Sequence, residues 1–155
     1  MLIALFQGDE TAGLAQLARL LGLARMQDAA LRVAYFHTIP RDRTDPDDRI
    51  VADRYREMLR IENTMREVVT AALRAAGRPS VELVVRFGPP IVEVSREAEA
   101  FAADTVAFAP GAGFGARWRA WRIRRRFAAR AGVRLLVLET DTVAPGSREI
   151  VVRPA

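Results

Sequence analysis

Short apolar runs alternate with longer amphipathic segments along most of this chain. Five runs consist almost wholly of apolar residues, at positions 2–6, 30–36, 81–85, 105–109 and 133–139. Runs of this kind are typical of strands that are buried on both faces of a sheet. Because helical segments lie between the runs, the pattern predicts an α/β domain, with an open parallel sheet and helices on both faces.

The segments between the runs have helical spacing and recognisable ends. Asp9 or Thr11 is expected to cap a first helix, whose inward face would hold Leu14, Leu17, Ala18 and Leu21. Residues 37–49 are polar and are predicted to form a loop. A third helix is predicted to begin at Pro89 and Pro90, because proline is favoured in the first turn. A long second helix is predicted between the polar loop and the third helix, over residues 48–76. Its apolar stripe would consist of Tyr55, Met58, Leu59, Met65, Val69, Ala72 and Leu73.

Residues 1–155 are predicted to form one domain, since this is a typical domain length and no low-complexity linker divides the chain. The tail, residues 139–155, contains one more apolar run at 149–152 after the turn residues Pro145 and Gly146. That run offers an additional strand at the edge of the sheet.

The residues that carry chemistry are few. With no Cys the chain excludes disulfides, thiolate metal sites and a Cys nucleophile, and with one His no metal site is expected. No nucleophile motif is visible, so no catalytic residue is predicted and His37 is interpreted as structural. Asp9 and Glu10 follow the first run, where helix capping and dipole compensation explain them as well as an acid pair or a metal site would.

The first residues do not have the pattern of an export signal. MLIALF lacks a basic start and is followed directly by QGDE. No apolar run approaches the roughly 20 residues that a membrane span needs. A soluble, cytoplasmic protein is therefore expected.

Positive charge is concentrated in one segment. All 24 basic residues are Arg, and the formal net charge is +5. Eight of them lie between Asp104 and Glu139 with no acidic residue among them, whereas the rest of the chain has 16 Arg against 19 acidic residues. The basic character therefore belongs to this segment and not to the chain as a whole.

A helix over residues 116–131 would place Ala116, Ala120, Ile123, Phe127 and Ala131 on one inward stripe. Trp118 and Trp121 would then lie on the outer side, beside Arg122 and Arg125. Three interpretations stay open for Trp118, Trp121 and Arg125. The rings pack on neighbouring loops or arginines, or they anchor a protein interface, most simply that of a homodimer. In the third interpretation they contact an anionic ligand, a nucleic acid or a membrane surface.

Residues 86–110 carry a spaced set of small and apolar positions: a Gly, a Pro two positions on, a helical segment with an apolar residue and Ala, and Ala-Asp before an apolar run. These positions are Gly88, Pro90, Val94, Ala98, Ala103 and Asp104. The set resembles the universal stress protein family, and ALFQGDETA and VAYFHTIP resemble its first strand and turn and its second strand. The resemblance covers residues 1–139 and implies a five-stranded parallel sheet of order 3-2-1-4-5, frequent dimerisation, and two subtypes of which one binds ATP.

The ATP-binding members of that family typically carry an Asp at the end of the first strand, Gly-x-x-Gly after the fourth, and Gly-Ser or Gly-Thr further on. Small residues there let backbone N–H groups approach phosphate oxygens. This chain has Gln7 at the first position, Ala109-Pro110-Gly111-Ala112 at the second, and Trp121-Arg122 or Arg122-Ile123 at the third. The resemblance therefore implies a degenerate site and no tight ATP binding.

In an open sheet of this order, ligands bind outside the carboxyl ends of the first and fourth strands, where the strand order reverses. The glycines at 111, 113 and 115 could hold phosphate there in another register, although G-x-G-x-G is a weak signal and Pro110 has no N–H. The predicted ligand-binding residues are Gln7, Gly8, Asp9, Pro110, Gly111, Gly113, Gly115 and Arg122.

Three functions stay open. The first is a non-enzymatic regulatory or stress-response protein that acts through a partner or ligand. The second is a stress protein that holds ATP or AMP through an altered glycine loop and Arg side chains. The third is a nucleic-acid-binding module that uses the helix over 117–130. A homodimer is expected because residues 133–139 would form a bare edge strand, unless residues 149–152 cover that edge within one chain.

Overall fold

The computed structural model describes residues 1–44, 50–128, 132–138 and 149–152 of the chain. Its main sheet has six strands in the order β5-β2-β1-β6-β7-β8. The strands are β1 (Leu2–Phe6), β2 (Arg32–His37), β5 (Glu82–Phe87), β6 (Thr105–Phe108), β7 (Arg134–Leu138) and β8 (Glu149–Val152). All neighbouring pairs are parallel except β7 and β8. The five parallel strands confirm the predicted order 3-2-1-4-5.

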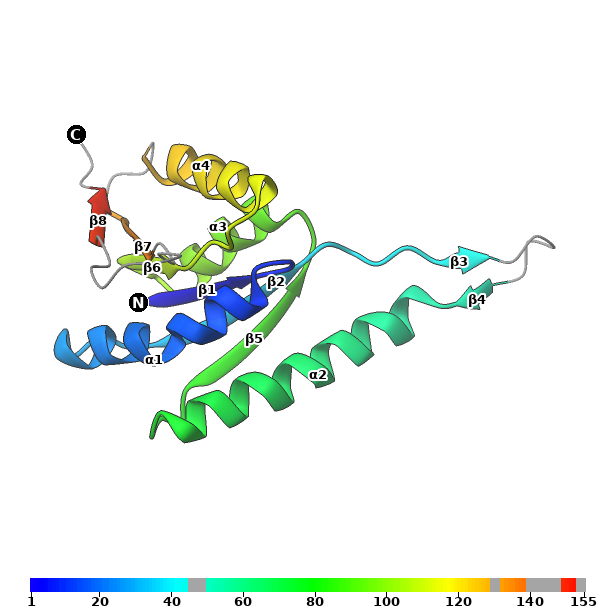
Figure 1. Ribbon diagram of the computed structural model, residues 1–155, viewed down its shortest axis with the longest axis horizontal. Coiled ribbons are helices and arrows are strands. Elements are labelled where there is room, and N and C mark those ends of the chain that lie inside the picture. The colour runs from blue at the N-terminus through cyan, green and yellow to red at the C-terminus, as the bar shows by residue number, and fades with distance from the viewer. Residues whose placement is uncertain (45–49, 129–131, 139–148, 153–155) are drawn as a thin grey trace.

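Helices cover both faces of this sheet (Figure 1). Two of them, α1 (Glu10–Met26) and α2 (Arg54–Ala75), pack on one face. The other two, α3 (Pro90–Ala100) and α4 (Phe114–Ala128), pack on the opposite face. The arrangement follows from the apolar strands, which leave neither face of the sheet suited to water.

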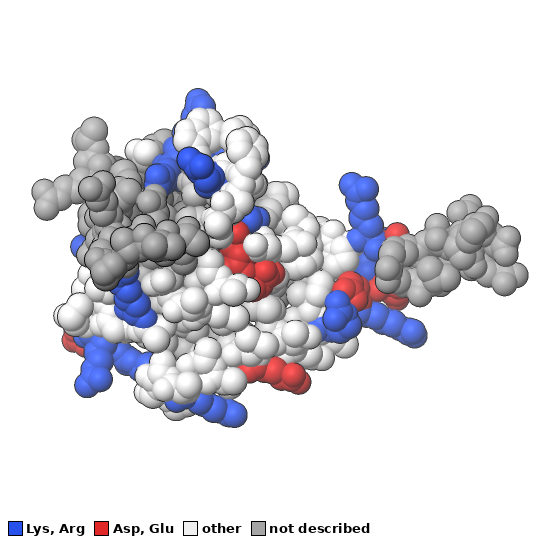
Figure 2. Space-filling view, in the orientation of Figure 1, with Lys and Arg blue, Asp and Glu red and all other residues white. Residues whose placement is uncertain are grey.

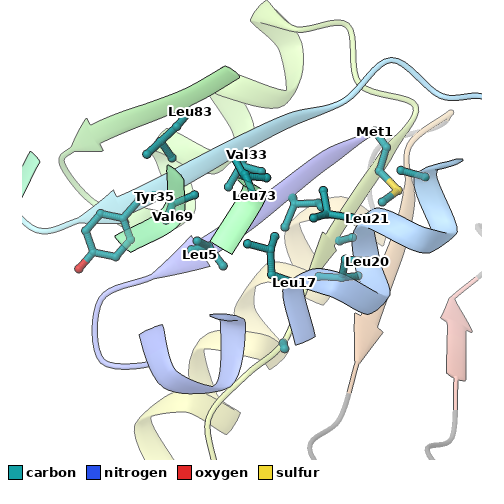
Figure 3. Close-up of a cluster of buried hydrophobic side chains, with 14 of the residues drawn as sticks. Met1, Leu5, Leu17, Leu20, Leu21, Val33, Tyr35, Val69, Leu73 and Leu83 are labelled. Atoms are coloured by element: carbon teal, nitrogen blue, oxygen red, sulfur yellow. The ribbon is translucent and has the colours of Figure 1, made fainter. Parts of the chain in front are cut away.

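Alternate residues of each strand supply the two cores. In β1, Ile3 and Leu5 belong to the core under α1 and α2, whereas Leu2, Ala4 and Phe6 belong to the core under α3 and α4. This alternation is the period of two that a strand imposes on its side chains. Figure 3 shows the first core, where leucines of α1 and α2 meet side chains of the strands.

The edge of the sheet at β7 is paired by the tail. β8 runs antiparallel to β7, with Leu135 opposite Val152 and Leu138 opposite Glu149. The bare edge that motivated the homodimer prediction is therefore absent among the described residues. β8 is then the last strand on this side of the described sheet.

The start of the long helix differs from its prediction. Residues 50–52 form β4 (Ile50–Ala52), which pairs antiparallel with β3 (Arg43–Thr44) in a separate two-stranded sheet. The helix begins only at Arg54, because Asp53 caps it by accepting a hydrogen bond from the Tyr55 backbone N–H at 2.8 Å. The β-branched pair Ile50-Val51 favours a strand before this cap. The predicted start at residue 48 and the all-loop prediction for 37–49 were wrong.

The apolar stripe of α2 is buried along only part of its length. Met65, Val69 and Leu73 are buried, whereas Tyr55 is 68% exposed and Leu59 is 58% exposed. The 22 residues of α2 span about 33 Å, and the 6 residues of its neighbour β5 span only about 20 Å. The first turns of α2 therefore extend past the sheet (Figure 1), and nothing described covers them.

Candidate functional site

The carboxyl ends of β1 and β6 meet at the point where the strand order reverses, and we call this region, around residues 7–9 and 110–111, the crevice. The chain leaves β1 for α1 on one face and leaves β6 for α4 on the other. Gly8 makes the turn after β1 with a φ of +83°, and its N–H donates to Oε2 of Glu10 at 2.8 Å. A crevice of this kind is the usual ligand position in an open α/β sheet.

A buried carboxylate occupies this crevice. Asp9 is 4% exposed, and its Oδ2 lies 3.1 Å from a guanidinium nitrogen of Arg119. Asp9 stands at the N-cap position of α1, but its side chain makes no capping hydrogen bond. The prediction that Asp9 caps this helix through its side chain was wrong, because the carboxylate turns instead towards Arg119.

Arg119 reaches the crevice from α4. Its Nη1 donates to the backbone carbonyl of Gln7 at 2.9 Å, and its guanidinium lies 5.9 Å from the ring centroid of Phe6. One side chain thus ties the first turns of α4 to the end of β1. Sequence reasoning missed Arg119, although helical phase carried a signal: it stands three residues after Ala116 and four before Ile123, at the border of the inward stripe.

Gly111 allows the carboxylate of Asp9 to approach the backbone. A Cβ at this position would lie 2.7 Å from Oδ1 of Asp9, closer than side chains tolerate. That oxygen is buried and has no hydrogen-bond partner among the described residues. The family resemblance predicts a phosphate close to the backbone here, and in the structure the Asp9 carboxylate takes that position beside Gly111.

The predicted ligand-binding residues are only partly brought together. Gln7, Gly8, Asp9 and Gly111 meet at the crevice, and buried Pro110 lies next to them in sequence. The amide oxygen of Gln7 is held by the N–H and hydroxyl of Thr38, at 3.1 and 2.7 Å. Gly113 and Gly115 lie at the exposed start of α4, and Arg122 lines a different groove, described below. Ligand binding by this set stays a prediction.

Glu10 has partners of its own. Its Oε1 accepts a hydrogen bond from the Tyr35 hydroxyl at 2.6 Å. Burial raises the pKa of Glu10, but the hydrogen bonds from Tyr35 and from backbone N–H groups outweigh burial and leave that pKa below its usual value. Burial and the Glu10 partner raise the pKa of Tyr35. Asp9 and Glu10 thus serve separate partners instead of forming an acid pair.

His37 lies between two aromatic rings. The centroid of its ring is 6.0 Å from that of Tyr35 and 5.8 Å from that of Phe87. Its Nδ1 contacts the carbonyl of Thr38. These contacts agree with the structural interpretation of His37. Among the described residues, no group of three or more His, Cys, Asp or Glu side chains is arranged to hold a metal ion.

The outer side of α4 carries both tryptophans. The inward stripe is buried at Ala116, Ala120, Ile123 and Phe127, while Ala131 lies outside the described residues. Trp118 is 50% exposed and Trp121 is 48% exposed. Their rings stack at a centroid distance of 5.0 Å and an interplanar angle of 19°, and Arg125 lies 5.6 Å from the Trp121 centroid. The predicted phase of this helix agrees with these positions.

A groove of about 770 Å³ lies between the start of α3 and the outer side of α4. We call it the α3–α4 groove. Figure 2 shows basic side chains gathered over α4, near the top of the view. The groove is lined by Pro89, Pro90, Ile91, Val92, Trp121, Arg122, Arg125 and Arg126.

A family model described as the Universal stress protein family matches residues 2–111 of the chain. The chain belongs to the universal stress protein family. This confirms the resemblance found in residues 86–110 and in the first two strands. A search of curated proteins found no match.

A solved structure supports the fold of this universal stress protein. It is described as a universal stress protein in complex with cAMP, and it aligns with a TM-score of 0.59 and 17% sequence identity. The alignment covers 91% of this chain and 98% of the other chain. The structural alignment supports the shared α/β fold. The sequence identity is too low to assign the ligand of that protein to this chain. None of the described helices combines the length and hydropathy that a membrane crossing requires.

Proposed function

We propose that this universal stress protein acts in the cytoplasm without catalysis, as a regulatory or stress-response protein that binds a ligand or partner. We also propose that its crevice does not hold ATP in the manner typical of nucleotide-binding members. The observation that carries the proposal is the ion pair of Asp9 and Arg119, which lies where the β1 and β6 ends meet.

The ion pair opposes a phosphate in two ways. A phosphate at Gly111 would have to displace the Asp9 carboxylate, or would meet a second negative charge at short range in a water-poor site. The family resemblance also implies that Trp121 and Arg122 replace the small residues of the third ATP motif, and the structure has both on the outer side of α4, lining the α3–α4 groove. Both features support a site that has lost the usual mode of ATP binding.

Calorimetric titration with Mg-ATP tests this proposal. The wild-type protein should show no micromolar affinity. Asp9→Asn removes the negative charge beside Gly111 and leaves the Arg119 guanidinium free to meet phosphate, so this variant should gain measurable binding. Asp28→Asn, which changes an exposed acid outside the crevice, is the matched control. Micromolar binding by the wild type would contradict the proposal.

Nucleotide binding in an altered mode is the second candidate. It is favoured by the guanidinium of Arg119 at the crevice, whose Nε is buried and has no hydrogen-bond partner among the described residues. The solved neighbour was obtained with cAMP, which makes a nucleotide such as ATP or AMP the first ligand to examine. Native mass spectrometry of the purified protein decides between the candidates, because a retained nucleotide adds its own mass.

Homodimerisation remains part of the proposal, now through the uncovered start of α2. Tyr55 and Leu59 expose apolar surface that a second copy would bury. Light scattering should give more than the 17.2 kDa of one chain. The double variant Tyr55→Ala with Leu59→Ala should return the mass to one chain, while Met26→Ala, at another exposed apolar residue, should not. A wild-type mass of one chain at tens of micromolar would exclude the dimer.

A further inference from the structure

We propose that the α3–α4 groove and the adjoining ring of Trp118 bind single-stranded nucleic acid, with bases stacking on Trp118 and Trp121 and phosphates held by the neighbouring arginines. This site is separate from the crevice. It uses the outer side of α4, whereas the crevice uses Arg119 on the inward side. The proposal therefore stands or falls independently of the ATP question.

The tryptophan pair provides the surface on which bases would stack. The two rings are stacked on each other and both stay about half exposed, so aromatic surface is held ready on the outside of the helix. The two indole rings are held in place by their contact with each other and by Arg125, which lies over the Trp121 ring. Exposed aromatic side chains beside cations are the recurrent means of holding unpaired bases without sequence preference.

The arginines of the groove are not neutralised by neighbours. Among the described residues, Arg122, Arg125 and Arg126 make no ion pair, and no acidic residue lines the groove. Some exposed arginines elsewhere are paired within their own helices, as Arg60 is with Glu57 and Arg66 with Glu62. The groove thus keeps a positive charge for an anionic partner.

Charge also decides between this ligand and a second copy of the chain. A two-fold dimer through α4 would place the same arginines opposite one another, and α4 offers no acidic residue to pair with them. A bilayer would need a wider apolar face than Trp118, Trp121 and Phe114 provide.

A strand fits this surface better than a single nucleotide. The exposed arginines of α4 run from Arg117 to Arg126, a distance of about 14 Å along the helix. One phosphate group cannot contact both ends of this row, whereas successive phosphates of a strand can. The groove volume of about 770 Å³ leaves room for a base beside Trp121.

Fluorescence anisotropy with a labelled oligodeoxythymidylate tests the proposal. We expect binding that weakens between about 50 and 200 mM salt, with a log–log slope near −2 if three phosphates are contacted. Replacing Trp118 and Trp121 by Ala should weaken binding by about tenfold or more and leave the slope unchanged. Replacing Arg122, Arg125 and Arg126 by Gln should weaken binding and flatten the slope. The matched control is Arg60→Gln with Arg66→Gln on α2, which should change little.

Tryptophan emission gives a second reading on the unlabelled protein. The chain has 2 Trp, both on this face, so quenching by unlabelled oligonucleotide reports contact at α4 alone. Absence of binding at low salt, or binding that the Trp and Arg variants leave intact, would overturn the proposal. So would equal affinity for AMP, or binding to anionic phosphatidylserine vesicles without binding to the oligonucleotide.

Discussion

The two sides of α4 place the same residue type in opposite surroundings. Arg119 faces inward, pairs with buried Asp9 and donates to the backbone at the end of β1. Arg122 and Arg125 face outward beside Trp121 and make no ion pair with any described residue. Helical phase separates Arg119 from Arg125, because six residues turn the helix by about 600° and leave the two side chains about 120° apart. Arg122 lies between them, about 60° from each. A basic segment is therefore not one surface, and each arginine has to be assigned by its position on the helix.

The largest expected effect concerns the inward stripe of α4. Phe127 is 2% exposed in the core beneath α3 and α4. Phe127→Ala should lower the free energy of unfolding by about 3–5 kcal/mol, because the lost contacts leave a cavity. Urea melts measure this loss. A loss below about 1 kcal/mol would mean that the phase of the helix, and with it the contrast between the two sides, is wrong.

The next effect concerns the ion pair. Asp9→Ala leaves the Arg119 guanidinium with one acceptor, the Gln7 carbonyl, in a largely buried place. The free energy of unfolding should fall by about 3 kcal/mol, the low end for a broken buried pair, because Arg119 keeps some exposure to water. Glu67→Ala, at an exposed acid of α2, should cost little. Equal losses in the two variants, measured by urea melts, would refute a special role for Asp9.

Acid should lower the stability of the folded protein through Glu10. Its pKa lies below the usual 4.5 in the folded protein, so the folded state binds fewer protons than the unfolded chain in this range. The stability from Glu10 is present above about pH 4.5 and is lost as pH falls through the lowered pKa. Glu10→Gln should make the stability less dependent on pH in this window, as thermal melts at several pH values would show. An unchanged pH profile would contradict the role given to its hydrogen bonds.

The smallest effect belongs to the outer side. Trp118→Ala with Trp121→Ala should change the free energy of unfolding by only about 1 kcal/mol in total, since changes at exposed positions are small. Urea melts beside those of Phe127→Ala give the comparison directly. A loss from the tryptophan pair that exceeds the loss from Phe127 would reverse the assignment of the two sides.

The features that the sequence predicted well depend on periodicity. The five apolar runs and the buried and exposed sides of α4 follow from regular spacing along the chain, whereas the strand order was implied by the family resemblance. Such patterns are visible because each element buries one set of positions whatever its exact neighbours are.

The features that were missed depend on contacts between distant residues. Asp9 and Arg119 are far apart in the sequence, and each has an ordinary local explanation as a helix cap or a surface arginine. Glu97, buried on α3, is likewise held by Arg32 at 2.9 Å and Arg86 at 2.7 Å, which come from β2 and β5. The exposed start of α2 was missed because its stripe continues past the end of the sheet that should cover it.

The central claim is that the chain fills its own crevice with the ion pair of Asp9 and Arg119. A double-mutant cycle measures it most directly, using urea melts of the wild type, Asp9→Ala, Arg119→Ala and the variant with both changes. The two losses should not add, and the coupling energy should be about 1–3 kcal/mol. Losses that add to within about 0.5 kcal/mol would show that the two side chains do not interact, and would leave the crevice open for a phosphate.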